Sequence, residues 1–305
     1  MCYSAQVEAR YKAYHRRFGA RMSLQQYAER VRDLRFLYPR ALERDFDPPH
    51  NAEEAAIAAL IAERHAAQAA QLEELLFSQR SRLVDAERAL AAKPSKTASD
   101  SARIARNKIA WAGDKLRELR RREPEPGDAR IYPGWYCPVL VIENGEPRVH
   151  LMRYQCRPAG KPLTFDQRFP GTYNARRDNL KKFWRAQYGS SHGLVLAKAF
   201  YEHVQTADGR RAVLEFRPQG WQQDMGVACL WSRWRGPEGA ELLSFAAITD
   251  EPPPEVAAAG HDRCIVPLKE ANWEAWLSPQ GRGDAALDAL LDDRERPFYE
   301  HRLAA

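Results

Sequence analysis

The most constraining feature of the sequence is a long segment, residues 52–122, with the composition and periodicity of two helices. Its first part, 52–92, is rich in Ala, Glu, Leu and Arg, and its Ile and Leu residues recur at helical spacing. The polar stretch 93–99 contains a proline, and after it Asp100 can cap a second helix that runs to about Arg122. We therefore predict an antiparallel helical hairpin, which any fold for this chain has to accommodate.

The two arms of the predicted hairpin differ in charge, because the first is acidic and the second is basic. Charge complementarity between the arms of a solvated hairpin is one interpretation. A basic arm that contacts nucleic-acid phosphates is another, and binding of a protein partner through the hairpin is a third. The positive charges of the second arm are Arg103, Arg106, Lys108, Lys115, Arg117, Arg120, Arg121 and Arg122, against Asp114 and Glu118.

Beyond a linker at 123–127 (EPEPG), short apolar segments alternate with turns, a pattern typical of β-strands. Asn144-Gly145 is a hairpin signal, since both residues tolerate the left-handed backbone of a tight turn. The sequence thus predicts an α+β fold, in which a mainly antiparallel β domain carries an inserted helical hairpin. The predicted strands are 135–142, 149–154, 194–200, 213–216, 227–231 and 243–248.

These patterns divide the chain into four segments. The predicted segments are an N-terminal catalytic segment (1–19) with a helix over 5–18 that Gly19 ends, a helical region (20–125) with the hairpin, a main β-rich domain (126–283) with helices near 177–187 and 270–277, and a C-terminal helical tail (284–305) with its helix over 284–291.

Composition limits the classes of protein to consider. With 44% hydrophobic residues the chain can form a substantial core, and its net charge of +6 permits nucleic-acid binding without proving it. The five cysteines form no CxxC pair, so we expect no metal site, no cofactor, and reduced thiols in a cytoplasmic protein. No apolar run is long enough to span a membrane, and the charged N-terminal residues contain no signal-peptide core.

Cys2 follows Met1, whose removal would leave a free α-amine beside a free thiol. An α-amine with a pKa of about 8 is substantially unprotonated in a cell, and a thiolate is a strong nucleophile. With an aldehyde the amine can form a Schiff base, and the sulfur can close onto the same carbon to give a thiazolidine ring. Many chains carry Cys at this position by chance, so Cys2 alone does not establish this chemistry.

Four short stretches can be considered together with Cys2, and their residues are 173–179 (YNARRDN), 199–203 (AFYEH), 244–250 (SFAAITD) and 261–267 (HDRCIVP). In this order they resemble the SRAP family, the abasic-site processing proteins also called SOS response-associated peptidases. The resemblance covers residues 1–4 and roughly 130–280, and leaves about 20–125 as an insertion. The matching positions are Cys2, Asn174-Ala175-Arg176, Phe200-Tyr201-Glu202, Ile248-Thr249 and His261-Asp262-Arg263.

This resemblance implies recognition of abasic sites in single-stranded DNA, with covalent capture of the sugar aldehyde through Cys2 as a thiazolidine crosslink. It also implies crosslink reversal or a lyase reaction, in DNA repair and the SOS response. Two alternatives stay open. An N-terminal Cys can act as a hydrolase or autopeptidase nucleophile with its own α-amine as base, or the protein can be a non-catalytic DNA-binding or adaptor protein.

Three motif residues have side chains that suit this chemistry. Glu202, between aromatic residues, can move the proton that opens the ring of an abasic deoxyribose, provided that burial raises its pKa. Asn174 can hold the amine or the sugar, because its amide both donates and accepts. His261 titrates near neutral pH and can move protons during Schiff-base formation or reversal. The alternatives are a solvated Glu, a turn Asn and a structural His.

Three further residues are expected to contact DNA. Arg176 is the strongest candidate for a phosphate contact, through its planar donor fork, and Arg177 is a weaker one. Thr249 can donate to a phosphate or sugar oxygen. An intramolecular ion pair is the alternative for the arginines, and an ordinary strand position is the alternative for the threonine.

The sequence departs from the family pattern at four places, which concern DNA affinity and substrate geometry more than the chemistry. Tyr3-Ser4 stand where the family has Gly-Arg, so the Arg that would hold DNA near the N-terminus is missing. The other departures are residues 153–158 in place of a tryptophan-containing segment, His203 in place of Trp, and Cys264-Ile265 in place of Met-Pro.

Overall fold

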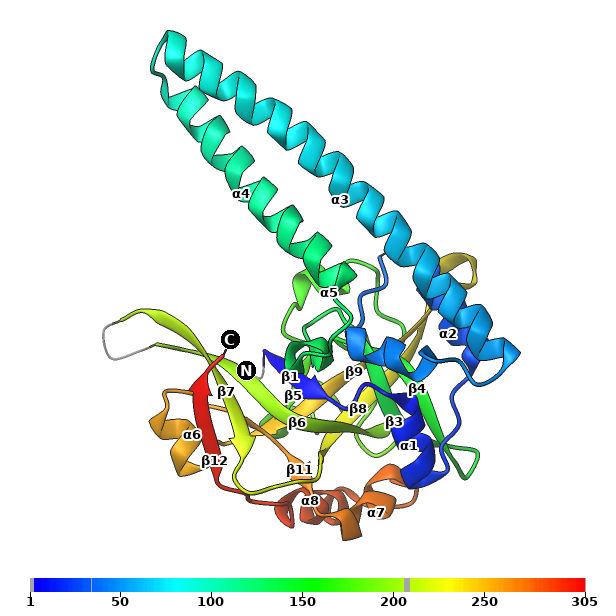
Figure 1. Cartoon of the computed structure of the whole chain (residues 1–305). Coiled ribbons are helices and arrows are strands. Elements are labelled where there is room, and N and C mark those ends of the chain that lie inside the picture. Colours follow the sequence, from blue (N-terminus) through cyan, green and yellow to red (C-terminus); the bar gives the residue numbers. More distant parts are fainter. Residues whose placement is uncertain (1–2, 34, 206–208, 305) are drawn as a thin grey trace. The chain divides into compact units, whose positions relative to one another are not determined.

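The structure, a computed structural model, describes residues 3–33, 35–205 and 209–304. It consists of two compact units, which we call the helical unit and the β unit (Figure 1). The fold class is α+β, as the sequence predicts. Within the described ranges, no helix is both long enough and apolar enough to cross a membrane.

The helical unit consists of Leu24–Arg35 and Pro49–Glu125. Its main elements are α3 (Ala52–Ala92) and α4 (Lys96–Arg120), which run antiparallel as the predicted hairpin, and α2 (Leu24–Val31) contacts α3 (Figure 1). The start of α4 differs from the prediction, because Ser95 and not Asp100 is its cap. Ser95 Oγ accepts a hydrogen bond from the backbone N–H of Ala98 at 3.2 Å, so α4 begins about one turn earlier than predicted.

Small side chains and ion pairs connect the two arms of the hairpin. Two ion pairs cross between them, from Arg106 to Glu87 at 2.7 Å and from Arg120 to Glu73 at 2.6 Å. Since α3 has a net charge of −3 and α4 of +4, the hairpin is nearly neutral as a whole. The buried residues of α4 recur at helical spacing and are Ala98, Ala102, Ala105, Ala112 and Leu116.

The β unit comprises the N-terminal segment up to Ser23, Phe36–Pro48 and the chain from Pro126 onwards. Its strands form a single sheet of twelve in the described part of the chain. They are β1 (Ser4–Val7), β2 (Arg130–Ile131), β3 (Tyr136–Glu143), β4 (Glu146–Tyr154), β5 (Asn174–Arg176), β6 (His192–Gln205), β7 (Arg211–Pro218), β8 (Met225–Arg235), β9 (Glu241–Asp250), β10 (Cys264–Ile265), β11 (Pro267–Leu268) and β12 (Tyr299–Leu303).

Strand β6 organises this sheet because it has different partners along its length. Its first half pairs with β3 and β8, and its second half pairs with β1 and β7. Since β3, β4, β9 and β8 pair in succession, these four strands and β6 close into a ring. Most pairs are antiparallel, as predicted, and β9 has parallel partners in β4 and β5. The N-terminal strand β1 pairs with the second half of β6.

The six predicted strands are all present, and the turn between β3 and β4 is confirmed. Asn144 and Gly145 have φ angles of 53° and 78°, the left-handed conformations that a two-residue hairpin turn requires. The remaining helices of the β unit are short: α1 (Tyr11–Phe18), α5 (Phe165–Arg168), α6 (Pro254–Ala258), α7 (Trp273–Leu277) and α8 (Asp284–Asp292).

Two predicted helices and the end of the predicted helical tail differ from the structure. Residues 4–7 are strand β1, so the helix predicted over 5–18 is restricted to α1, which ends at Gly19 as expected. The helix predicted near 177–187 is a 3₁₀ turn followed by further turns. The tail is helical only in α8, because its last part forms β12 against β7. In β1 and β12, pairing with distant strands determines the conformation.

Helix α7 covers one side of the ring with two tryptophans. Trp276 stacks on His192 with ring centroids 3.8 Å apart, and His192 Nδ1 lies 2.9 Å from the Trp276 carbonyl. Gly189 N–H donates to His192 Nε2, and burial lowers the pKa of His192 to about 4. Trp273 lies against Gly226, where an added Cβ would be 2.4 Å from the indole ring.

Candidate active site

The centre of the site is a contact between two of the predicted residues, Glu202 and His261. Glu202 lies on β6 and is fully buried, on the same side of the strand as Phe200, which stacks on Phe216. Its Oε2 lies 3.1 Å from His261 Nε2. The motif segment on β6 and the motif segment that follows α6 are therefore in contact through a carboxyl–imidazole pair that is shielded from water.

His261 is held so that either ring tautomer has a partner at Nδ1. Nδ1 lies 2.9 Å from the Arg263 carbonyl, to which an Nδ1–H would donate, and 3.3 Å from the Arg263 N–H, from which it would accept. The ring can therefore gain or lose a proton at Nε2 while it stays anchored. Burial lowers the pKa of His261, which favours the neutral imidazole. An imidazole held in this way is suited to proton transfer with Glu202.

Strand β9 brings the other motif segments side by side. Asn174 pairs with Ala247, and Arg176 pairs with Thr249, in the parallel register of β5 and β9. Thr249 also faces Ile265 of β10, so the strand after His261 lies on the other edge of β9. Asn174 and Thr249 are both buried, with 5% and 1% of their surfaces exposed. Neither is a solvated surface residue, which agrees with a place in a site or in the core.

The two predicted DNA-binding arginines have different surroundings. The exposed Arg176 forms an ion pair with Asp178 at 2.6 Å, and this hydrogen bond raises its pKa, with a smaller contribution from the charge of Asp262. Arg177 is directed away from that pair, because its guanidinium contacts Asp250 at 3.0 Å and Asp292 of α8 at 2.6 Å. Arg176 therefore lies at the surface beside the His261 loop, whereas Arg177 joins β9 to α8.

Cys2, the predicted nucleophile, lies outside the described residues. The structure begins next to it, with the Tyr3 ring packed edge-on against His203 at 4.5 Å between centroids. Ser4, the first residue of β1, is opposite Tyr201 in the ladder with β6. Burial raises the pKa of Tyr201 to about 12, so this phenol is neutral at physiological pH. The N-terminal strand thus starts one residue along β6 from Glu202.

A residue that the sequence analysis missed lies beside this N-terminal strand. Arg130 of β2 donates from Nε to Ser4 Oγ at 3.0 Å, and its guanidinium carbon lies 3.7 Å from the centroid of the Tyr201 ring. It is part of no motif, and its position depends on the pairing of β1 with β2, between which the helical region is inserted. A basic residue in a short strand carries no sequence signal for such a position.

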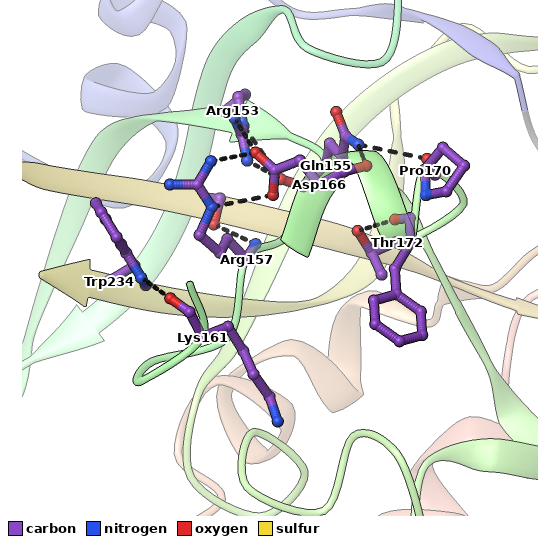
Figure 2. A network of polar contacts seen from close by, with 10 residues as sticks. Arg153, Gln155, Arg157, Lys161, Asp166, Pro170, Thr172 and Trp234 are labelled. Carbon is purple, nitrogen blue, oxygen red and sulfur yellow. Dashed lines mark hydrogen bonds and ion pairs between the residues drawn. The ribbon is translucent and has the colours of Figure 1, made fainter. Parts of the chain in front are cut away.

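The loop before β5 is held by a second group that the sequence analysis did not assign. Figure 2 shows Arg153 and Arg157 both directed at Asp166. The Arg157 guanidinium also lies over the Trp234 ring at 4.6 Å, and hydrogen bonds from the two arginines hold the pKa of Asp166 below its usual value despite the opposing effect of burial. The segment 153–158 thus fixes the chain that leads into Asn174.

The family model for SOS response associated peptidases (SRAP) matches residues 90–303, and the chain belongs to this family. The match begins at residue 90, so it includes α4, which the sequence analysis assigned to the insertion, and it does not include Cys2. No curated protein matches the chain.

Several solved structures have a similar chain path. A protein from Bordetella bronchiseptica is 19% identical with a TM-score of 0.49, covering 58% of this chain and 87% of its own. A protein from Bacteroides thetaiotaomicron is 15% identical with a TM-score of 0.49, covering 58% and 78%. A phage-related protein from Bordetella bronchiseptica is 18% identical with a TM-score of 0.45, covering 61% and 85%.

Proposed function

We propose that this SRAP protein recognises abasic sites in single-stranded DNA and captures the sugar aldehyde covalently through Cys2. The observation that carries the proposal is the buried contact between Glu202 and His261, 3.1 Å apart, on the strand that pairs with the N-terminal strand. A carboxyl and an imidazole in contact can move protons, which both ring opening and Schiff-base chemistry require.

Cys2 precedes Ser4 by two residues in the chain, and two residues of extended chain span at most about 7 Å. Ser4 is opposite Tyr201, the neighbour of Glu202 on β6. An aldehyde bound at this edge of the sheet is therefore within reach of both the N-terminal residue and the proton-transfer groups.

The capture reaction consists of two bond-forming steps. After removal of Met1, the α-amine of Cys2 adds to the open-chain aldehyde, and loss of water gives an imine. The Cys2 sulfur then adds to the imine carbon while its proton passes to the nitrogen, which closes a thiazolidine ring. One C–N and one C–S bond form, and the aldehyde oxygen leaves as water.

The remaining predicted residues have supporting roles in this proposal. Glu202 moves the proton that opens the sugar ring, and His261 relays it through Nε2. Asn174, buried on β5, positions the sugar or the amine. Arg176 exchanges its contact with Asp178 for a phosphate of the DNA, and Thr249 supports β5 from the adjacent strand.

Intact mass spectrometry after incubation with a single-stranded abasic oligonucleotide tests the proposal. The protein should lack Met1 and should form a heat-stable adduct whose mass is the sum of the two partners minus one water. Cys2→Ala should form none, whereas Cys137→Ala, which removes a buried thiol of β3, should form it normally. An equal yield from Cys2→Ala, or an adduct on protein that retains Met1, would exclude capture by this residue.

A further inference from the structure

The half-buried Arg130 at the start of β2 is a cation with no acidic partner among the residues that the structure describes. Its Nε–H is used by Ser4 Oγ, at 3.0 Å, while the two terminal nitrogens have no acceptor in the described part of the protein. The nearby buried acid on the same face of the sheet, Glu215, is contacted instead by Arg217 at 2.9 Å and Arg302 at 3.2 Å. Two arginines thus contact this carboxylate, and Arg130 is not one of them.

Two aromatic rings fix the plane of the Arg130 guanidinium. Its central carbon lies 3.7 Å from the centroid of the Tyr201 ring and 5.0 Å from that of the Tyr132 ring. Cation–π contacts offset part of the cost of removing the charge from water, but they use the face of the guanidinium and leave the N–H groups of its edge available. This edge is a preorganised fork for two oxygens of one anionic group.

We propose that Arg130 binds a backbone phosphate of the DNA strand beside the N-terminal residue. The proposal deepens the proposed function and rests on it for the identity of the ligand. Arg130 is hydrogen-bonded to Ser4, and Ser4 is two residues from Cys2 in the chain. A phosphate bound by Arg130 would therefore belong to a nucleotide next to the captured sugar. A phosphodiester has two non-bridging oxygens that share one negative charge, and the fork can bind both of them.

The alternative is that Arg130 only ties β2 to β1 through Ser4. Two substitutions separate these roles. Arg130→Gln removes the charge and the fork, whereas Ser4→Ala removes the hydrogen-bond acceptor and keeps the charge. If Arg130 is only structural, both variants should give the same result. If Arg130 binds a phosphate, only Arg130→Gln should lose DNA binding.

The experiment measures equilibrium binding of single-stranded oligonucleotides without an abasic site, as a function of salt concentration. Arg130→Gln should weaken binding several-fold and reduce the slope of log K against log salt by about 0.7, the value for one phosphate contact to a single strand. Ser4→Ala should keep the wild-type slope, and Arg130→Lys should keep the slope while it binds less tightly than wild type. Arg302→Gln, which removes an exposed charge from the same face, should change the slope less than Arg130→Gln does.

Three results would overturn the proposal. They are an unchanged salt slope in Arg130→Gln, equal losses of DNA affinity in Arg130→Gln and Ser4→Ala, and a wild type that does not bind single-stranded DNA. If Arg130→Gln does not fold, the salt dependence of Arg130→Lys tests the proposal instead. A lower slope in Arg130→Lys, which keeps the positive charge, would also overturn the proposal. Because these oligonucleotides contain no aldehyde, the result is independent of adduct formation. Failure of covalent capture by the wild type would therefore contradict the proposed function and leave phosphate binding by Arg130 intact.

Discussion

Glu202 has the properties of a proton-transfer group, namely complete burial and a titratable partner, His261, at 3.1 Å. On the proposed function, Glu202→Gln should slow adduct formation by about 100-fold or more, with DNA affinity little changed, because the amide keeps the shape but not the exchangeable proton. Rates of adduct formation and equilibrium binding, measured on the same oligonucleotide, check this.

The matched control for this substitution is Glu215→Gln, a buried carboxylate on β7. Glu215 is opposite Tyr201, the neighbour of Glu202 on β6, so it faces the other side of the sheet. It should not affect the rate of the chemical step. Parallel losses of rate and of binding in Glu202→Gln would show that this residue is structural. His261→Ala should change the rates of formation or reversal in the same assay.

His192 makes the stability of the β unit depend on pH. Its pKa is about 4 in the folded protein and about 6.5 in an unfolded chain, so the unfolded state binds the proton first as the pH falls. The stabilising effect of neutral His192 is therefore complete above pH 6.5 and is lost between about pH 6.5 and 4, amounting to about 3 kcal/mol. Denaturant unfolding of the β unit at several pH values measures this dependence.

His192→Gln should flatten the unfolding free energy over this pH range, since Gln can donate and accept but does not titrate. It should also lower stability at neutral pH, where the stacking on Trp276 is lost. His203→Gln, at an exposed position, is the control for the substitution itself. A wild-type slope in His192→Gln would assign the pH dependence to other groups.

Short motifs located two contacting residues, Glu202 and His261, because each segment carries a characteristic order of side chains. They could not reveal Arg130, whose position depends on the pairing of β1 with β2. They also grouped Arg176 with Arg177, although adjacent residues on an extended chain face opposite sides. The structure shows the consequence, since Arg177 contacts Asp250 and Asp292.

At the scale of elements, the close packing of α7 against β8 depends on Gly226, which has no side chain. Gly226→Ala would place a methyl group 2.4 Å from the Trp273 indole, which is held by a hydrogen bond from its Nε1 to the Leu268 carbonyl. The β unit should lose about 1–3 kcal/mol of stability, as expected for overpacking of a rigid core. The midpoint of thermal unfolding would report this loss.

The matched substitution in the helical unit is Gly113→Ala in α4. No neighbouring atom lies within 4 Å of the added Cβ, so the change only lowers the conformational entropy of the unfolded chain and improves helix propensity. It should stabilise the hairpin by about 0.5–1 kcal/mol. A destabilising effect of the same size as that of Gly226→Ala would show that α4 is more tightly packed at this position than the structure indicates.

Alternating apolar residues and the Asn144-Gly145 turn made the long strands of the ring predictable, since this pattern is local. The strands β1 and β12 were not predictable, because each becomes extended through pairing with a strand that is distant in sequence. The start of α4 was misplaced for a local reason: Ser95 and Asp100 are both good caps, and the choice depends on where Pro94 ends α3.

At the scale of the whole molecule, the function of the hairpin can be tested separately from the chemistry. The ion pairs between α3 and α4 and their nearly balanced charges favour a neutral hairpin over an extended DNA-binding surface. Replacement of residues 52–122 by a short Gly-Ser linker should therefore leave the affinity for single-stranded DNA and its salt dependence unchanged, and adduct formation should continue.

The same replacement has two other informative outcomes. A weaker affinity with a shallower salt slope would show that the hairpin contacts DNA phosphates. Failure of the β unit to fold would show that the predicted boundary between the helical region and the main domain is wrong. An oligomeric state that changes with the deletion would indicate a protein partner for the hairpin, including a second copy of the chain.

The pairing of β1 with β6 also determines the order of events while the chain is being synthesised. Strand β1 cannot pair with β6 until β6 has left the ribosome, some 200 residues later. At about 5–20 residues per second, synthesis of this length takes roughly 10 to 40 seconds. Throughout that interval β1 has at most the short strand β2 to pair with, whereas the hairpin can form locally. We expect Met1 to be removed in this period, so that the mature amine exists before β1 pairs with β6.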